Sequence, residues 1–193
     1  MSVMDKRATR TAHLARRRAI PAEDRLAADQ ALAAGVKALV KGLGTIAGYA
    51  PMRGEPGGEP LLAALRDSGS AVLLPVLRAD LDLAWARWTG ELTPPGPAGV
   101  REPVGALLEP LAIAEADLVL VPAVAVDRHG VRLGRGGGSY DRALTRVRPG
   151  VPIVAVIDDA DLVDHLPADA HDVHVTDVLT PSGLTSVRSR PSA

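Results

Sequence analysis

Apolar residues recur along the chain at two spacings, which predict alternating strands and helices. Continuous apolar runs, typical of strands buried on both faces, cover residues 45–52, 71–77, 118–126 and 151–157. Apolar residues spaced three or four apart predict helices over 22–41 and 60–69. Strands that alternate with helices are typical of a mostly parallel sheet covered on both sides. We therefore predict an α/β fold: one three-layer α/β/α domain spanning residues 1–193.

The remaining segments predict smaller elements. Residues 81–89 alternate apolar and polar side chains, which favours an antiparallel partner and hence a hairpin in the sheet. Glycine and proline crowd residues 90–110, which predicts a long loop. We further expect a short acidic helix or turn over 158–166, a last short strand over 173–178 and a polar, frayed tail over 180–193.

The most distinctive segment joins the strand at 118–126 to a helix predicted from Asp141 onward. It carries two arginines and four glycines: Arg132, Gly134, Arg135, Gly136, Gly137 and Gly138. Glycines let backbone N–H groups approach an anion, and arginine offers forked donors suited to phosphate. No Lys-Ser/Thr pair follows the glycines, so this is not a Walker A loop. A plain flexible turn is the alternative, but a strand end, arginines and a helix start together favour an anion site.

Basic residues dominate positions 1–20, where alanines and Leu14 favour a helix. Lys6 and Arg10 are four residues apart and share a face, and Arg17 follows on the same side. By itself, this pattern is more typical of a solvated basic helix than of a binding site.

Composition narrows the function classes. The formal net charge is −1, which argues against nucleic-acid binding. No cysteine is present, so disulfides and thiol catalysis are excluded, and no apolar run approaches the ~18 residues of a membrane span. We expect a cytoplasmic protein with no membrane partner. Without phenylalanine, the core must be aliphatic, and Trp85 and Trp88 are predicted to pack in it rather than stack on a ligand.

Residues 121–144, VPAVAVDRHGVRLGRGGGSYDRAL, resemble the signature of the 5-formyltetrahydrofolate cyclo-ligase family, also called methenyltetrahydrofolate synthetases. The match is long and ungapped. It departs from the family pattern at Ala123 (usually Gly), Val126 (usually Phe) and Ser139 (usually Tyr). Residues 100–103, VREP, also resemble a family segment of the form I-x-E-P, which has a possible role in covering the substrate.

The resemblance implies a monomeric enzyme that uses ATP and Mg²⁺ to convert 5-formyltetrahydrofolate to 5,10-methenyltetrahydrofolate through a phosphorylated formyl intermediate, releasing ADP and phosphate. It implies catalytic roles for Arg135 and Tyr140. The implied ATP-binding residues are Lys6, Arg10, Arg132, Gly134, Arg135, Gly136, Gly137, Gly138, Ser139 and Tyr140.

For the folate, the resemblance implies a glutamate in the loop after the first strand. Glu55 fits by position and Glu59 is the second choice, although each alone reads as a surface charge. The implied substrate-binding set is Ala50, Glu55, Arg135, Gly137 and Ser139, with Tyr49 as an alternative to Ala50.

The implied magnesium ligands are Asp141 and Asp172, and Mg²⁺ needs only one or two carboxylates beside phosphate oxygens. A zinc site at His171, Asp172 and His174 is disfavoured because no second pair of ligands stands out.

Two other functions remain open at this point. One is a different small-metabolite phosphoryl-transfer enzyme that uses the same glycine loop. The other is a non-catalytic folate- or nucleotide-binding protein, for which the loss of a tyrosine at Ser139 would be a sign.

Overall fold

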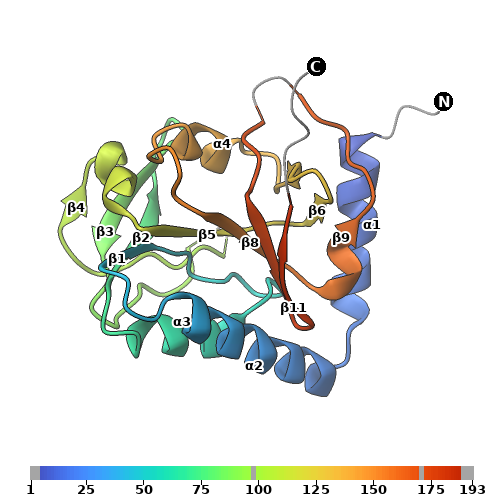
Figure 1. Cartoon of the computed structure of the whole chain (residues 1–193), viewed down its shortest axis with the longest axis horizontal. Coiled ribbons are helices and arrows are strands. Elements are labelled where there is room, and N and C mark those ends of the chain that lie inside the picture. Colours follow the sequence, from blue (N-terminus) through green and yellow to red (C-terminus); the bar gives the residue numbers. More distant parts are fainter. Residues whose placement is uncertain (1–4, 97–98, 170–171, 188–193) are drawn as a thin grey trace.

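A twisted eight-stranded sheet with helices on both faces forms the centre of the protein (Figure 1). The structure, a computed structural model, describes residues 5–96, 99–169 and 172–187. The strand order is β11-β10-β8-β5-β1-β2-β3-β4. The four pairings among β10, β8, β5, β1 and β2 are parallel, and both edges are antiparallel. The mostly parallel α/β fold and the antiparallel hairpin are therefore confirmed.

The bounds of the elements are as follows. The helices are α1 (Lys6–Ala19), α2 (Ala22–Leu39), α3 (Gly58–Arg66) and α4 (Ser139–Leu144), with 3-10 turns η1 (Pro110–Glu115) and η2 (Asp159–Asp161). The strands of the large sheet are β1 (Thr45–Ala47), β2 (Ala71–Leu77), β3 (Leu83–Arg87), β4 (Leu107–Leu108), β5 (Leu118–Pro122), β8 (Ile153–Val156), β10 (Asp177–Thr180) and β11 (Gly183–Ser186). A smaller sheet pairs β7 (Arg132–Leu133), β6 (Ala125–Asp127) and β9 (Leu162–Val163).

Side chains of the central strands alternate between two apolar layers. On β5, Leu118 and Leu120 face α2 and α3, whereas Val119 and Val121 face α4 and η1. Burial on both faces explains why these strands are continuous apolar runs in the sequence. Figure 1 shows α2 and α3 along one side of the sheet and α4 on the other. No helix in the described ranges is long and apolar enough to cross a membrane.

The predicted strand at 118–126 is wrong in one respect, because it is two strands in different sheets. β5 ends at Pro122, and β6 begins at Ala125 in the small sheet. Between them, the carbonyl oxygens of Ala123 and Val124 accept hydrogen bonds from the guanidinium of Arg17 instead of from a neighbouring strand (2.7 and 3.1 Å). The chain therefore leaves the large sheet beside α1.

Several predicted bounds are also wrong. β1 spans only three residues of the predicted 45–52, and the predicted last strand lies at 177–180 rather than 173–178. The predicted polar tail contains β11, an edge strand that pairs with β10 even though its side chains are exposed. The predicted loop at 90–110 includes β4, and α4 begins two residues early, at Ser139. The tail residues 188–193 and the first four residues of the basic segment lie outside the described residues.

Candidate active site

A pocket of about 540 Å³ opens at the carboxyl ends of β1 and β5. The chain proceeds from β1 to β2 in one direction of the sheet and from β5 to β8 in the other, so the strand order reverses between β1 and β5. In open α/β sheets, such a reversal leaves a crevice at the strand ends where ligands bind. Residues after β1 (Tyr49, Ala50) and after β5 (Ala123, Val124) line the pocket here.

The glycine loop, residues 134–138, forms one wall of the pocket between β7 and α4. Gly136 has φ +105° and Gly138 has φ +69°, a left-handed backbone that favours glycine. Arg10 of α1 holds the loop, because its Nε donates to the carbonyl oxygen of Gly134 (2.8 Å). The Arg10 guanidinium also lies beside Gly136, 3.6 Å from the place where a Cβ would be. Glycine backbone and a cation thus meet at one wall of the pocket.

Arg132 and Asp141 form an ion pair across the base of the glycine loop (Nη2–Oδ1 2.7 Å). The Arg132 guanidinium lies 5.7 Å from the centroid of the Tyr140 ring, a cation–π contact. Tyr140 is partly buried, and desolvation raises the pKa of its hydroxyl above the ordinary value, with the charge of Glu55 adding to the effect. The hydroxyl therefore stays protonated and can donate a hydrogen bond at neutral pH.

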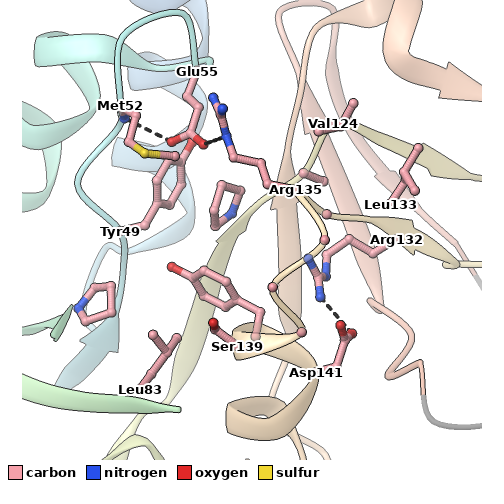
Figure 2. Close-up of a pocket in the computed structure, with 18 of the residues that line it drawn as sticks. Tyr49, Met52, Glu55, Leu83, Val124, Arg132, Leu133, Arg135, Ser139 and Asp141 are labelled. Carbon is pink, nitrogen blue, oxygen red and sulfur yellow. Dashed lines mark hydrogen bonds and ion pairs between the residues drawn. The ribbon is translucent and has the colours of Figure 1, made fainter. Parts of the chain in front are cut away.

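Glu55 and Arg135 connect two sides of the pocket (Figure 2). Glu55 is buried; its Oε1 accepts from Arg135 Nε (2.9 Å) and its Oε2 from the backbone N–H of Met52 (2.9 Å). Arg135 itself is 45% exposed at its side chain. The bond to Glu55 uses one of the five N–H groups of the guanidinium, so the others can serve a ligand.

Lys6 bridges two aspartates at the rim of the pocket. Its Nζ lies 2.7 Å from Asp172 Oδ2 and 2.8 Å from Asp169 Oδ2. Desolvation opposes the charged form of Lys6, but hydrogen bonds and charge from the two aspartates outweigh it, so its pKa is raised. Lys6 stays protonated at neutral pH.

The structure brings all predicted site residues to this one pocket. It is lined by Lys6, Arg10, Ala50, Glu55, Arg132, Gly134, Arg135, Gly136, Gly137, Gly138, Ser139, Tyr140, Asp141 and Asp172. Tyr49 lines it as well. Glu59, the second choice for the folate, does not; its exposed carboxylate pairs with Arg101 instead (2.6 Å).

A metal site is less fully formed. Within residues 5–96, 99–169 and 172–187, no three His, Cys, Asp or Glu side chains are grouped so that they could hold a metal ion. Asp141 and Asp172 both line the pocket with oxygen donors, which suit Mg²⁺ when phosphate oxygens and water complete its shell. His171, part of the disfavoured zinc reading, lies outside the described residues.

Sequence reasoning missed three charged residues of the pocket: Arg17, Arg101 and Asp169. Arg17 shares a helix face with Lys6 and Arg10, and this spacing is a pattern from which its place at the pocket can be predicted. Asp169 and Lys6 are 163 positions apart, so no local spacing could pair them. The two tryptophans behave as predicted: Trp85 is fully buried in the core beside α4, and Trp88 packs against the core beside α2 and α3.

The fold and the site together define an α/β protein with an anion-binding pocket at a switch point of its sheet. A family model described as the 5-formyltetrahydrofolate cyclo-ligase family matches residues 2–181. The 5-formyltetrahydrofolate cyclo-ligase of Mycolicibacterium smegmatis is 41% identical over 194 residues, covering 97% of this chain and 100% of the relative. The chain belongs to the 5-formyltetrahydrofolate cyclo-ligase family and is an enzyme of the ligase class.

Solved structures agree with this assignment. The structure of Aquifex aeolicus 5,10-methenyltetrahydrofolate synthetase superimposes with a TM-score of 0.74 at 28% identity, covering 97% of this chain and 95% of that one. The synthetase of Mycoplasma pneumoniae gives a TM-score of 0.74 at 23% identity, covering 92% and 99%, which supports the fold.

Proposed function

We propose that this enzyme uses ATP and Mg²⁺ to convert 5-formyltetrahydrofolate to 5,10-methenyltetrahydrofolate. The observation that carries the proposal is the convergence of four distant segments on one pocket. Helix α1, the loop after β1, the glycine loop with α4, and Asp172 each bring charged or donor groups to it. Its volume of about 540 Å³ lies within the range of small-molecule sites.

The chemistry needs two positioned substrates rather than a covalent nucleophile on the protein. The formyl oxygen attacks the γ-phosphorus of ATP, and the bond to the departing ADP breaks. The N10 nitrogen of the same folate then attacks the formyl carbon, and the carbon–oxygen bond to phosphate breaks. The N10 proton leaves with the phosphate, so the products are methenyltetrahydrofolate, ADP and inorganic phosphate. Catalysis of this kind depends on orientation and on charge stabilisation.

The glycine loop and its flanking cations suit the phosphate side of this reaction. Backbone N–H groups of residues 134–138 would cradle the phosphates, helped by Ser139 at the start of α4. Lys6, Arg10 and Arg132 would neutralise their charge. Asp141 and Asp172 would hold Mg²⁺, which supplies positive charge to the β- and γ-phosphate oxygens.

Arg135 and Tyr140 suit the place where the two substrates meet. Arg135 is tied through Nε to Glu55, the proposed folate ligand, and belongs to the glycine loop that would hold ATP. Its remaining N–H groups would stabilise the transferring phosphoryl group. The protonated hydroxyl of Tyr140 would orient the formyl or phosphate oxygen, while Ala50 and Gly137 would contact the folate.

The test is formation of methenyltetrahydrofolate, followed by its near-ultraviolet absorbance with Mg-ATP and 5-formyltetrahydrofolate. We expect product only when both ATP and Mg²⁺ are present, with one ADP formed for each product molecule. Product without ATP would contradict the phosphoryl-transfer mechanism. A folded protein that binds both ligands without turnover would be a binding protein, with Ser139 as the first suspect.

A further inference from the structure

Asp29 is a buried carboxylate outside the pocket, and the proposed chemistry does not use it. It lies on α2 with 9% of its surface exposed, and it is not among the residues that line the pocket. Burial raises the pKa of Asp29, against the opposing effects of a hydrogen bond from Gly57 and the charge of Arg25. A carboxylate is costly to bury unless it is hydrogen-bonded, so the group that it binds indicates its role.

Asp29 and Tyr49 hold the two polar ends of one peptide unit. Asp29 Oδ1 accepts from the backbone N–H of Gly57 (2.7 Å). The carbonyl oxygen of the same unit, that of Pro56, accepts from the hydroxyl of Tyr49 (2.8 Å). Tyr49 is 2% exposed, and burial raises the pKa of its hydroxyl, which therefore stays protonated and donates. The Pro56–Gly57 peptide is thus fixed at its N–H and at its carbonyl.

This peptide unit directly follows Glu55, the proposed folate ligand. Peptide units are planar and proline fixes φ, so one free torsion, ψ of Pro56, joins the held peptide to the preceding unit that begins at Glu55. On the other side, the N–H of Glu55 donates to the carbonyl oxygen of Met52 (2.9 Å). Figure 2 shows the Glu55 carboxylate between Met52 and Arg135, to which it is bonded. The backbone that carries this carboxylate is therefore held from both sides.

The start of α3 is shaped around the Asp29 carboxylate. Gly57 and Gly58 both have positive φ (+98° and +45°), a backbone that favours glycine. At Gly58, a Cβ would lie 2.7 Å from Asp29 Oδ2, so a larger residue there would displace the carboxylate. The two glycines and Asp29 are therefore parts of one arrangement.

We propose that Asp29 is a positioning residue for folate binding. It holds the Pro56–Gly57 peptide, and through this peptide it fixes the carboxylate of Glu55 where the substrate needs it. Tyr49 fixes the carbonyl end of the same peptide. The inference rests on the proposed role of Glu55, and it matters because binding groups act well only when held within about 0.5 Å of the productive position.

The experiment measures the KM for 5-formyltetrahydrofolate and the KM for ATP. Asp29→Ala removes the acceptor of the Gly57 N–H, and we expect the KM for folate to rise about tenfold while the KM for ATP stays within about twofold. Asp29→Asn keeps an acceptor oxygen and should stay within about threefold of wild type. Asp117→Ala is the matched control, because Asp117 Oδ2 also accepts from backbone N–H groups, those of Gly44 and Thr45, but at the opposite end of β1 from the pocket. It should change neither KM.

A double-mutant cycle separates positioning from general damage. Because Asp29 acts through Glu55, Asp29→Ala should raise the KM for folate by less than about twofold in a Glu55→Ala background. Tyr49→Phe removes only the hydroxyl at the other end of the held peptide and should raise the KM for folate about three- to tenfold. If Asp29→Ala does not fold, Tyr49→Phe decides in its place.

Each other result has a distinct meaning. Equal rises in both KM values, a full effect in the Glu55→Ala background, or the same rise in Asp117→Ala would show a merely structural role. An unchanged KM for folate, or Asp29→Asn that behaves like Asp29→Ala, would also overturn the inference. If wild type binds 5-formyltetrahydrofolate in calorimetry without turnover, the proposed function fails, and the Kd takes the place of KM with the same expectations. No binding to wild type would reject both proposals.

Discussion

Helix α1 carries basic residues at both ends, but their surroundings are opposite. Near its C-terminal end, Arg17 is only 3% exposed, and its Nε binds the fully buried Asp161 (2.7 Å). His13 and Arg16 contact the same carboxylate. Near its N-terminal end, Lys6 is about a quarter exposed and reaches two aspartates at the rim of the pocket. The same residue types therefore form a buried anchor at one end and proposed ligand-binding groups at the other.

Burial decides which role each charge has. A buried charge must keep its partner, because separating the pair leaves an unpaired charge out of water. A partly exposed cation can keep its partner and still offer its remaining N–H groups to a ligand. On this argument, the anchor formed by Arg17 and Asp161 fixes α1 on the small sheet. In the pairs Lys6–Asp172 and Arg135–Glu55, the carboxylate is buried but the cation is partly exposed, so the cation can serve the proposed phosphate and folate while it keeps its partner.

Arg17→Met would break the anchor and should have the largest effect. It leaves Asp161 buried and removes the donors to the Ala123 and Val124 carbonyls. We expect the free energy of unfolding to fall by about 3 kcal/mol, the lower end for a broken buried pair, because Arg16 and His13 still contact Asp161. Denaturant unfolding measures this change. Arg18→Met, at an exposed position of the same helix, should stay within about 0.5 kcal/mol. Equal effects would mean that burial does not separate the two roles.

Arg135→Ala tests the partly exposed cations of the pocket, the second group in the comparison. Because Arg135 is 45% exposed but its partner Glu55 is buried and keeps the Met52 N–H, its loss should lower the unfolding free energy by about 1–2 kcal/mol, less than Arg17→Met, whereas kcat should fall about 100-fold through lost stabilisation of the phosphoryl group. Steady-state kinetics with both substrates varied measures this. Arg128→Ala removes an exposed arginine paired with Asp164 and should leave kcat unchanged. Unchanged kcat and KM in Arg135→Ala would remove Arg135 from the mechanism.

The sequence predicts the layers of the fold and the site segments better than it predicts the connections between them. Apolar runs identify the central strands because both faces of a parallel sheet are buried. The break after Pro122 was missed because the carbonyls of Ala123 and Val124 bind Arg17, a residue more than 100 positions away. β11 was missed because an exposed edge strand needs no apolar pattern.

For the site too, local patterns are predictable from the sequence, whereas contacts between distant segments are not. The glycine loop and Glu55 can be located from local pattern and family resemblance. The pairing of Lys6 with Asp169, and the approach of Arg101 to the pocket, depend on the packing of distant segments. Physical reasoning on the chain alone cannot supply such contacts.

Gly136→Ala separates backbone strain from ligand binding. Gly136 and Gly150 both have positive φ (+105° and +85°), so an alanine at either should cost about 1–2 kcal/mol of stability. Only Gly136 lines the pocket, and its Cβ would stand beside the Arg10 guanidinium. We expect about tenfold weaker ATP binding in Gly136→Ala and wild-type binding in Gly150→Ala, measured by calorimetry. Equal ATP affinity in the two variants would reject the phosphate cradle.

The ion pair of Asp82 with Arg146 is intermediate in burial between the anchor of Arg17 with Asp161 and the exposed ion pairs of the surface. It tethers the β2–β3 hairpin to the segment after α4 with two hydrogen bonds (2.6 and 2.9 Å), and the neighbouring Leu81 lines the pocket with a left-handed backbone (φ +64°). The bonds to Arg146 lower the pKa of Asp82 below its ordinary 3.8, against the opposing effect of burial.

Asp82→Asn should therefore cost about 1 kcal/mol at pH 7, less than loss of the buried anchor and more than loss of an exposed pair. A lowered carboxyl pKa contributes stability that is fully present above the unfolded value and is lost as pH falls through the folded one. The stability difference between wild type and Asp82→Asn should stay constant from pH 7 to 5 and shrink below about pH 3.8, as measured by urea unfolding. A difference that persists unchanged at the lowest pH would mean that the asparagine disturbs the hairpin by its shape, and that charge at this site stabilises nothing.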